Sequence, residues 1–536
     1  MSNIHISLPV GRVKGPGPTP HSFSFVAFAQ HQALKVGEFI VCPVELAGTE
    51  QPLLARVVKS LSLRVLPNTF LSAPTLWPSD VAATVGYVGH SSHSLEVVAE
   101  IIGYFDPHLN DFINPRILPQ AGQLVRLAGD ALLTHLLNRL QPGQVGAATV
   151  GSLLSRTSGA VPIVLDVAAV AATHLAVIAS TGAGKSYLAS VLIEEMLRPC
   201  NRAAILLIDP HGEYGSLAEL PDHLQLQTED YQPRVTIHKP GQLKVRLGSL
   251  SLTDLQYLLP NMSERMEYVL GQAFRQVSRQ HQQQWTLADL RRAIDEIAEP
   301  KAGQKGTNYR ETARAVLWRL NAILADSLLF DDSASLHLNQ LIKPGQCTIL
   351  QLNEVNSRQQ QVLVATLLRQ LFQARLQTSR EQVSNYSPLY LPYPVFVLIE
   401  EAHHFAPANG EAISTGILKQ ILGEGRKFGV GVGLISQRPG KLDSDVLSQC
   451  NTQCLLRIVN PNDQVKVRES VESVGQDFLR ELPALSKGQA IIAGAAVNTP
   501  VLCRVRRRHT PHSAEDISAP QVWQHYSNGP IPTNKI

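Results

Sequence analysis

The stretch Leu175-Ala-Val-Ile-Ala-Ser-Thr-Gly-Ala-Gly-Lys-Ser-Tyr187 decides the fold class of this 536-residue chain. A short apolar run is followed by a glycine-rich loop, and a helical pattern begins directly after it. From Ala179 to Ser186 the loop matches the phosphate-binding pattern G-x-x-x-x-G-K-[ST], except that Ala179 replaces the first glycine. Gly182 and Gly184 let backbone N–H groups point at phosphate oxygens, and the helix N-terminus adds its dipole. The segment predicts a P-loop.

The residues of such a loop contact defined parts of a bound nucleotide. Lys185 is expected to reach the β- and γ-phosphates, and Ser186 to ligate Mg²⁺. We therefore expect ATP and Mg²⁺ as the ligands of this segment. The expected nucleotide-binding residues are Ser180, Thr181, Gly182, Ala183, Gly184, Lys185, Ser186 and Tyr187.

A second apolar run, Val395-Phe-Val-Leu-Ile399, is followed by two acids and resembles a Walker B element. Glu400 is expected to hold Mg²⁺ through its water shell, and Glu401 to be the base that deprotonates the attacking water. Aspartate is common at the first acid, and the extra methylene of Glu400 is absorbed through water. His403 and His404 favour packing or support of the acids over metal binding, because no partner ligands are evident.

The motif Ile208-Asp-Pro-His-Gly-Glu-Tyr214 stands at the end of another apolar run. Two interpretations remain open for it. Asp209 and Glu213 either approach the metal-bound water or a neighbouring subunit, or the motif is a strand-to-loop turn fixed by Pro210 and Gly212.

The fourth motif combines Gly425-Arg-Lys-Phe-Gly429 with Ser436-Gln-Arg-Pro439. Gln437 follows a strand beside the Walker B element, where a polar side chain senses the γ-phosphate. Arg426 belongs to the helix between these strands, and we expect it to project into a neighbour's ATP site and stabilise transition-state charge. Arg438 and Arg457 are the competing candidates for that role, and a surface salt bridge is the alternative for Arg426.

From about residue 160 onward, short apolar runs alternate with amphipathic helices, as in a parallel sheet buried on both faces. We expect an α/β, RecA-like P-loop ATPase core in two parts, 146–249 and 343–508, around a helical insertion at 250–342. A tail or arm follows at 509–536. The expected strands are Leu175–Ile178, Ala204–Ile208, Thr348–Leu352, Val395–Ile399, Val432–Ile435 and Cys454–Val459.

Residues 1–145 have a different sequence pattern, in which short apolar segments alternate with turn residues. This spacing predicts a small N-terminal β-barrel or sandwich, with a short helix from Gly129 to Leu140 leading out of it. The expected strands include Val36–Cys42, Leu54–Val58, Leu95–Ile102 and Gln123–Leu127.

Composition sets further bounds on the protein. A net charge of +3 permits nucleic-acid binding without demanding it. The six cysteines form no Cys-x-x-Cys pair and are typical of buried thiols in a reducing compartment. The apolar stretch Ile163–Ala179 is interrupted by Asp166 and His174, and residues 1–20 lack the apolar core of a signal peptide. We expect a cytoplasmic protein with no membrane segment.

The order of the four motifs resembles the HerA branch of the HerA–FtsK superfamily, and the β-rich start is similar to the small barrel that precedes the ATPase there. The resemblance implies a homohexameric ring with double-stranded DNA in its channel and ATP sites between subunits. It also implies an effector docked on the barrel, either a NurA-like nuclease or a sirtuin-like enzyme, in DNA end processing or antiphage defence. Lys185, Ser186, Glu400, Glu401, Gln437 and Arg426 match the family's functional positions.

Two classes of function stay open at this point, and a third, a secretion or conjugation ATPase of the same superfamily, is disfavoured because no spanning helix is expected. The first is an ATP-dependent DNA translocase or helicase, which would drive loops against phosphates without reading bases. The alternative is an ATP-switched ring scaffold that assembles and regulates an effector, with little motor activity of its own. Stimulation of ATP hydrolysis by DNA discriminates between them. Lys301, Lys305 and Arg310 are basic loop residues that either contact DNA or are solvated surface charges.

Overall fold

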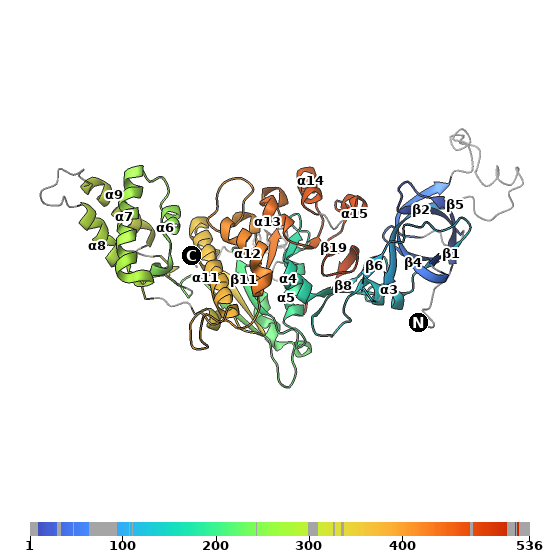
Figure 1. Cartoon of the computed structure of the whole chain (residues 1–536), viewed down its shortest axis with the longest axis horizontal. Helices are drawn as coiled ribbons and strands as arrows, with labels where there is room; N and C mark the ends of the chain where they lie inside the picture. The colour runs from blue at the N-terminus through green and yellow to red at the C-terminus, as the bar shows by residue number, and fades with distance from the viewer. Residues whose placement is uncertain are drawn as a thin grey trace, which may run out of the picture.

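The computed structural model describes residues 9–28, 34–46, 48–63, 94–106, 108–109, 111–242, 244–298, 309–324, 327–333, 337–471, 475–511, 520 and 523–524. Three parts follow one another along the long axis of the molecule: a β-barrel at one end, a central α/β part, and a group of helices at the other end (Figure 1). Lys301 and Lys305 lie outside the described residues.

The N-terminal strands close into a barrel through a pairing of β2 with β5. Around the ring, β1 pairs with β7, β7 with β3, β3 with β4, β4 with β5, and β2 with β1, all antiparallel. Closure removes the free edges that an open sheet would expose. The ring strands are β1 (Pro9–Pro16), β2 (Ser22–Ala27), β3 (Phe39–Leu46), β4 (Thr49–Leu63), β5 (Ser94–Asp106) and β7 (Leu124–Leu127), and β6 (Asp111–Ile113) pairs with β5 outside the ring.

Alternation along β3 explains how the barrel is attached to the rest of the chain. Ile40 and Cys42 point into the barrel core. Phe39 and Val41 point the other way and join a core cluster with Leu133 of α3 (Asp130–Leu137), the short helix expected after the barrel. Because that cluster continues into the central sheet, the barrel is packed on the α/β part by buried apolar side chains.

A single sheet of eleven described strands runs through the central part, in the order β12-β15-β11-β16-β17-β10-β18-β19-β20-β8-β9. The strands from β12 to β18 are parallel, and the last four are joined antiparallel. Their bounds are β8 (Ala147–Leu153), β9 (Pro162–Asp166), β10 (Leu175–Ile178), β11 (Ala204–Asp209), β12 (Arg234–His238), β15 (Gln346–Gln351), β16 (Val395–Ile399), β17 (Val430–Ser436), β18 (Thr452–Leu455), β19 (Gln489–Gly494) and β20 (Val501–Val505).

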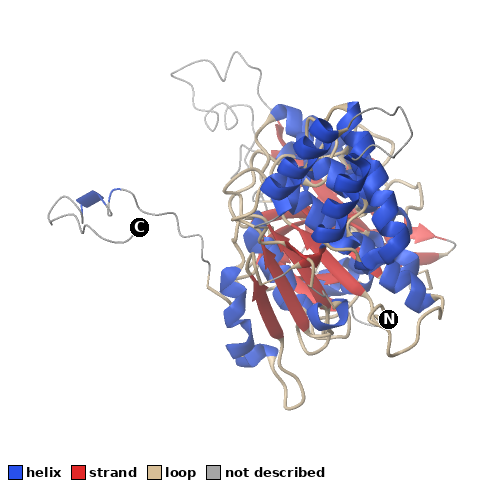
Figure 2. Cartoon of the chain, turned by 90° about the vertical axis from the view of Figure 1, so that its left-hand side faces the viewer, coloured by secondary structure: helices blue, strands red, loops and turns tan. Residues whose placement is uncertain are grey.

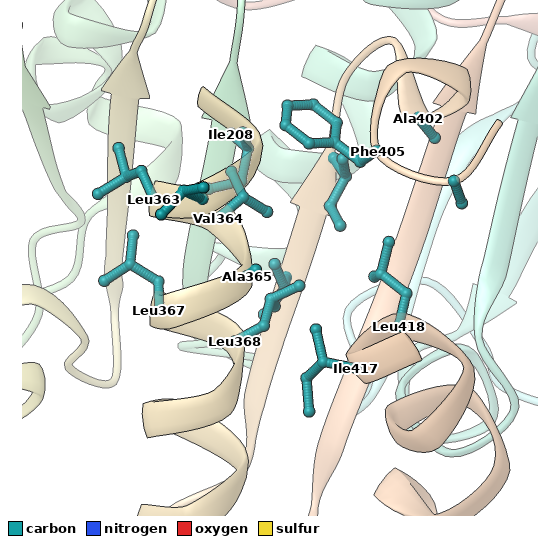
Figure 3. Close-up of a cluster of buried hydrophobic side chains, with 14 of the residues drawn as sticks. Ile208, Leu363, Val364, Ala365, Leu367, Leu368, Ala402, Phe405, Ile417 and Leu418 are labelled. Carbon is teal, nitrogen blue, oxygen red and sulfur yellow. The ribbon is translucent and has the colours of Figure 1, made fainter. Parts of the chain in front are cut away.

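Helices cover both faces of this sheet, which explains the wholly apolar runs of its strands. On β11, Ile205 and Leu207 belong to one core cluster, whereas Leu206 and Ile208 belong to the cluster on the opposite face. Figure 3 shows the cluster that contains Ile208, to which α11 contributes Leu363 and Val364 and α12 contributes Ile417 and Leu418. The helices of this part are α4 (Val167–Thr173), α5 (Lys185–Met196), α11 (Ser357–Ser379), α12 (Thr415–Phe428), α13 (Ser444–Ser448), α14 (Pro461–Ser470) and α15 (Gln476–Glu481).

The helical end of the molecule faces the viewer in Figure 2. Its helices are α6 (Leu252–Leu258), α7 (Glu264–His281), α8 (Leu287–Ala298), α9 (Arg310–Leu324) and α10 (Leu338–Leu341). The buried Asp254 carboxylate of α6 accepts hydrogen bonds of 2.6 and 2.8 Å from Arg369 of α11, which fastens these helices to the sheet's covering layer. One element departs from the all-helical expectation, because β14 (Phe330–Asp331) pairs with β13 (Val245–Arg246).

The expected α/β class with a preceding barrel is confirmed, with one correction to a strand. The sixth expected strand, Cys454–Val459, is wrong in its bounds, since β18 ends at Leu455. After Leu455, the carbonyl oxygen of Arg457 accepts the N–H of Ser180 at 2.8 Å. The backbone at Arg457 therefore hydrogen-bonds to the P-loop and not to a neighbouring strand. None of the described helices is both long and apolar enough to span a membrane.

Candidate active site

The carboxyl ends of β10, β11, β16 and β17 meet at one edge of the sheet, as parallel strands require. A cavity of about 500 Å³ lies at this edge. Binding sites of open α/β sheets form at this edge of the strands. The residues that line it are Ser180, Thr181, Gly182, Gly184, Lys185, Ser186, Tyr187, His211, Glu213, Glu401, Gln437 and Lys487.

The glycine-rich loop between β10 and α5 forms one wall of the cavity. Gly182 has φ +76° and Gly184 has φ +102°, a backbone region that L side chains rarely adopt. The loop is held from both sides, because Ala179 donates to the carbonyl of Ser436 at 3.2 Å and Ser180 to that of Arg457 at 2.8 Å. Ala183 is buried in the core beneath the loop and does not line the cavity.

Lys185 is held between the two acids that follow β16. Its Nζ donates to Oε1 of Glu400 and lies 3.2 Å from Oε1 of Glu401. Burial opposes the lysine's charge, but the two carboxylates together raise the pKa of Lys185 above its usual value. Burial raises the pKa of Glu400 to about 7, although Lys185 favours its charged form. The sequence thus brings a cation and two acids together from segments more than 200 residues apart.

The Asp-Pro-His-Gly-Glu-Tyr motif packs beside the same acids and hydrogen-bonds to one of them. The Asp209 carboxylate accepts the backbone N–H groups of residues 211–214, so this side chain fixes the strand-to-loop turn, a role that the turn interpretation gave to Pro210 and Gly212. Tyr214, which is fully buried, donates its hydroxyl to Oε2 of Glu400 at 2.5 Å. Glu213 instead points into the cavity and accepts the hydroxyl of Ser186 at 2.5 Å.

Glu401 has a strained backbone and an unsatisfied oxygen. Its φ of +50° is uncommon for a residue other than glycine, and strain of this kind concentrates at functional sites. The side chain is buried, and its Oε2 has no hydrogen-bond partner among the described residues, although Nδ1 of His403 lies 3.2 Å away. Burial lowers the pKa of His403 to about 4, so the imidazole is neutral at pH 7.

Gln437 joins the end of β17 to the P-loop. Its Oε1 accepts the hydroxyl of Thr181 at 2.8 Å, and both residues line the cavity. Arg426, in contrast, is exposed near the end of α12, which leads into the start of β17 and therefore lies at the opposite edge of the sheet. Arg438 and Arg457 are exposed at the cavity's edge of the sheet, and neither is among the described residues that line the cavity.

The oxygen atoms of this site fit Mg²⁺ together with a nucleoside triphosphate. Ser186 and Glu213 offer a hydroxyl and a carboxylate inside the cavity, whereas Glu400 is fully buried, is not among the described residues that line the cavity, and accepts a hydrogen bond from Lys185. Mg²⁺ prefers such hard ligands and commonly uses one or two carboxylates plus phosphate oxygens and water. Groups of three or more His, Cys, Asp or Glu side chains placed to hold a metal are absent from the described part of the chain.

Three residues of the site were not assigned a place from the sequence. Lys487 and His211 line the cavity, and Tyr214 supports Glu400. Tyr214 and His211 belong to the Asp-Pro-His-Gly-Glu-Tyr motif, whose place at the end of a parallel strand is the signal that puts them near the acids. Lys487 stands in an ordinary Ser-Lys-Gly turn, and only the order of strands in the sheet places it beside the P-loop.

A phosphate-binding loop at a strand-to-helix turn, with its lysine against paired acids two strands away, defines a P-loop ATPase. A family model described as "Helicase HerA, central domain" matches residues 148–371. The DNA double-strand break repair helicase HerA of Pyrococcus furiosus is 30% identical over 448 residues, which is 76% of this chain and 77% of that protein. The chain belongs to the HerA family.

Other similarities extend over a larger part of the chain or concern solved structures. A probable helicase of Methanocaldococcus jannaschii is 28% identical over 519 residues, covering 90% of this chain and 92% of that protein. Among solved structures, VirB4 of Thermoanaerobacter pseudethanolicus aligns with a TM-score of 0.48 and 12% identity, over 68% of this chain and 98% of that one.

Proposed function

We propose that this chain is an ATP-driven DNA translocase and helicase that works as a homohexameric ring on double-stranded DNA. The observation that carries the proposal is the contact of the P-loop Lys185 with Glu400 and Glu401 beside a cavity of about 500 Å³. Membership of the HerA family supports the DNA-directed part, since the relative from Pyrococcus furiosus is a helicase of double-strand break repair.

The roles of the site residues follow from what each can reach. Lys185 exchanges its carboxylate contacts for the β- and γ-phosphates when ATP and Mg²⁺ bind. Ser186 and Glu400 hold the metal, directly or through water. Glu401 is the base, because its Oε2 makes no hydrogen bond with the described residues and can accept a proton from an attacking water. Gln437 senses the γ-phosphate through its hydrogen bond to Thr181 of the loop.

Arg426 is the proposed trans-acting arginine. Its place near the end of α12, at the sheet edge opposite the cavity, prevents it from reaching the ATP of its own subunit. In a closed ring, one face of each subunit meets a different face of the next, so an exposed arginine can enter the neighbour's site. There it would neutralise charge that develops on the transferred phosphoryl group.

The N-terminal barrel, residues 1–145, is the proposed docking domain for an effector. It lies at one end of the molecule, with the helical insertion at the other end and the ATPase parts, 146–249 and 343–508, between them (Figure 1). A NurA-like nuclease or a sirtuin-like enzyme is the proposed partner. DNA end processing and antiphage defence are the pathways in which such an assembly would act.

The decisive experiment is ATP hydrolysis by the purified chain with and without linear double-stranded DNA. Lys185→Ala and Glu401→Ala serve as active-site controls. Stimulation by DNA that both substitutions abolish is the expected result. Hydrolysis that is lost in both variants but indifferent to DNA would contradict the motor and favour an ATP-switched scaffold. Normal hydrolysis by both variants would overturn the assignment of the site.

A further inference from the structure

Lys487 approaches the nucleotide cavity from a segment far from the P-loop in sequence. It lines the cavity and stands in the turn that leads into β19. The turn is well fixed, because Gln489 donates to the carbonyl of Ser486 at 3.1 Å and Val505 donates to that of Gly488 at 2.9 Å. A Cβ built on Gly184 would lie 3.8 Å from the backbone nitrogen of Gly488. The turn therefore packs directly against the phosphate-binding loop.

The strand order places Lys487 on the opposite flank of the P-loop from the catalytic acids. On one side of β10, Ile178 is in register with Ser436 of β17, beyond which lies β16 with its acids. On the other side, Ile178 is in register with Leu455 of β18, and Leu455 pairs with Ile491 near the start of β19. Glu401 and Lys487 thus face the loop from two sides.

The charges around the cavity leave a bound nucleotide in need of a further cation, and Lys487 is placed to supply it. Lys185 is already engaged by two carboxylates, and Glu213 adds a third acid. ATP with Mg²⁺ still carries two negative charges, which need compensation in a partly enclosed site. Of the two lysines that line the cavity, Lys487 is the one whose ammonium group has no hydrogen-bond or ion-pair partner among the described residues.

We propose that Lys487 is a second phosphate-binding cation, which contacts the α- and β-phosphates from the flank opposite Glu401. The inference rests on the proposed function as an ATPase and deepens it. Because the γ-phosphate lies toward Glu401 and Gln437, Lys487 contacts the part of the nucleotide that ATP and ADP share. It contributes to affinity for both nucleotides and not to the hydrolytic step.

The test is the dissociation constant of the full-length chain for fluorescent ATP and ADP in the presence of Mg²⁺. Lys487→Gln should raise both constants about tenfold or more, as loss of a charge-assisted contact does, and leave kcat within about twofold at saturating ATP. Lys487→Arg should restore most of the affinity. Lys343→Gln, an exposed lysine at the opposite edge of the sheet, is the matched control and should change nothing.

Three results would overturn the inference. Unchanged dissociation constants for Lys487→Gln, with normal binding by the wild-type chain, would exclude Lys487 as a phosphate-binding residue without contradicting the proposed ATPase function. A loss confined to ATP would place Lys487 at the γ-phosphate, against the geometry argued above. A wild-type chain that bound neither nucleotide would refute the proposed function itself, and Lys487 with it.

Discussion

The hydroxyl of Tyr214 donates a 2.5 Å hydrogen bond to Oε2 of Glu400, and both side chains are fully buried. The bond fixes the carboxylate whose other oxygen meets Lys185. Tyr214→Phe should therefore leave the fold intact but misplace Glu400. A hydrogen bond to a charged group is worth about 1.5–3 kcal/mol, so we expect at least about a tenfold loss in kcat/KM.

The loss in Tyr214→Phe should be accompanied by a shift of the Mg²⁺ dependence of hydrolysis to higher concentration. Tyr393→Phe is the matched control, because Tyr393 donates to the carbonyl of Ile342 at 2.6 Å, outside the residues that line the cavity. Unaltered hydrolysis and Mg²⁺ dependence in Tyr214→Phe would contradict a positioning role for this tyrosine.

Glu401→Gln should separate nucleotide binding from hydrolysis. The amide keeps the shape of the side chain but cannot accept the proton of the attacking water, so kcat should fall by about 10²- to 10⁴-fold. ATP binding should persist and trap the unhydrolysed nucleotide, which single-turnover and binding measurements would both report. Glu411→Gln, an exposed acid, should behave as the wild type. Multiple turnovers at the normal rate would exclude Glu401 as the base.

Mixing variants should show that Arg426 acts between subunits. Alone, Arg426→Ala should lose about 10³-fold or more of its ATPase rate, as removal of a trans-acting arginine does, and Lys185→Ala should be inactive. In mixed rings, a subunit with an intact P-loop can sit beside one with an intact Arg426, so the mixture should regain hydrolysis.

Arg438→Ala and Arg457→Ala provide the comparison, because both arginines are exposed at the cavity's own edge of the sheet. If Arg438→Ala or Arg457→Ala complements Lys185→Ala while Arg426→Ala does not, the trans-acting role belongs to that other residue. The readout is the steady-state rate of each mixture against the sum of its components.

Glu194 of α5 anchors the segment that follows β20. Its buried carboxylate accepts the backbone N–H groups of His509 and Thr510, and it pairs with Arg506 at 2.9 Å. Residues 509 and 510 are therefore fastened to the helix that carries the P-loop. Glu194→Ala leaves Arg506 and two amides without this partner and should lower the free energy of unfolding by about 3–5 kcal/mol, measured by denaturant titration.

The control for this substitution is Glu219→Ala, which removes an exposed carboxylate and should change stability by no more than about 0.5 kcal/mol. Equal stabilities of the Glu194→Ala and wild-type chains would mean that the anchor contributes nothing to folding.

His174 should make stability fall in mild acid. Its ring accepts the N–H of Val432 at 3.1 Å and lies 3.0 Å from the carbonyl of Leu422, and burial lowers its pKa to about 4. The unfolded chain takes up this proton near pH 6.5 and the folded chain does not. The contribution is therefore complete above pH 6.5 and declines as the pH falls toward 4, by about 2 kcal/mol at pH 5.

The stability difference between the wild-type chain and His174→Asn isolates this contribution, since the carboxylates titrate in both. His174 has φ +62° and ψ 160°, a strained region for any residue other than glycine, and the same strain in both chains leaves the pH dependence of their difference unaffected. The difference should narrow from pH 7 to pH 5, and a constant difference would show that the buried imidazole is protonated in the folded chain.

Local sequence pattern is enough to predict the class of fold and most of the chemistry. The apolar runs around Leu175 and Val395 predict buried parallel strands because only side chains that avoid water on both faces fit there. The P-loop and the acids after β16 follow from local spacing, since a phosphate cradle and its lysine are built from consecutive residues. Lys185, Ser186 and Glu401 were predicted on this basis, and they line one cavity.

Which distant segments meet at that cavity depends on the three-dimensional arrangement of the strands. The order of strands brings the Lys487 turn to one flank of the P-loop and Glu401 to the other, and strand order depends on packing between elements that local sequence does not encode. The same holds for the hydrogen bond from Tyr214 to Glu400 and for the edge at which Arg426 stands. Local pattern specifies each element, whereas the burial of shared faces specifies their neighbours.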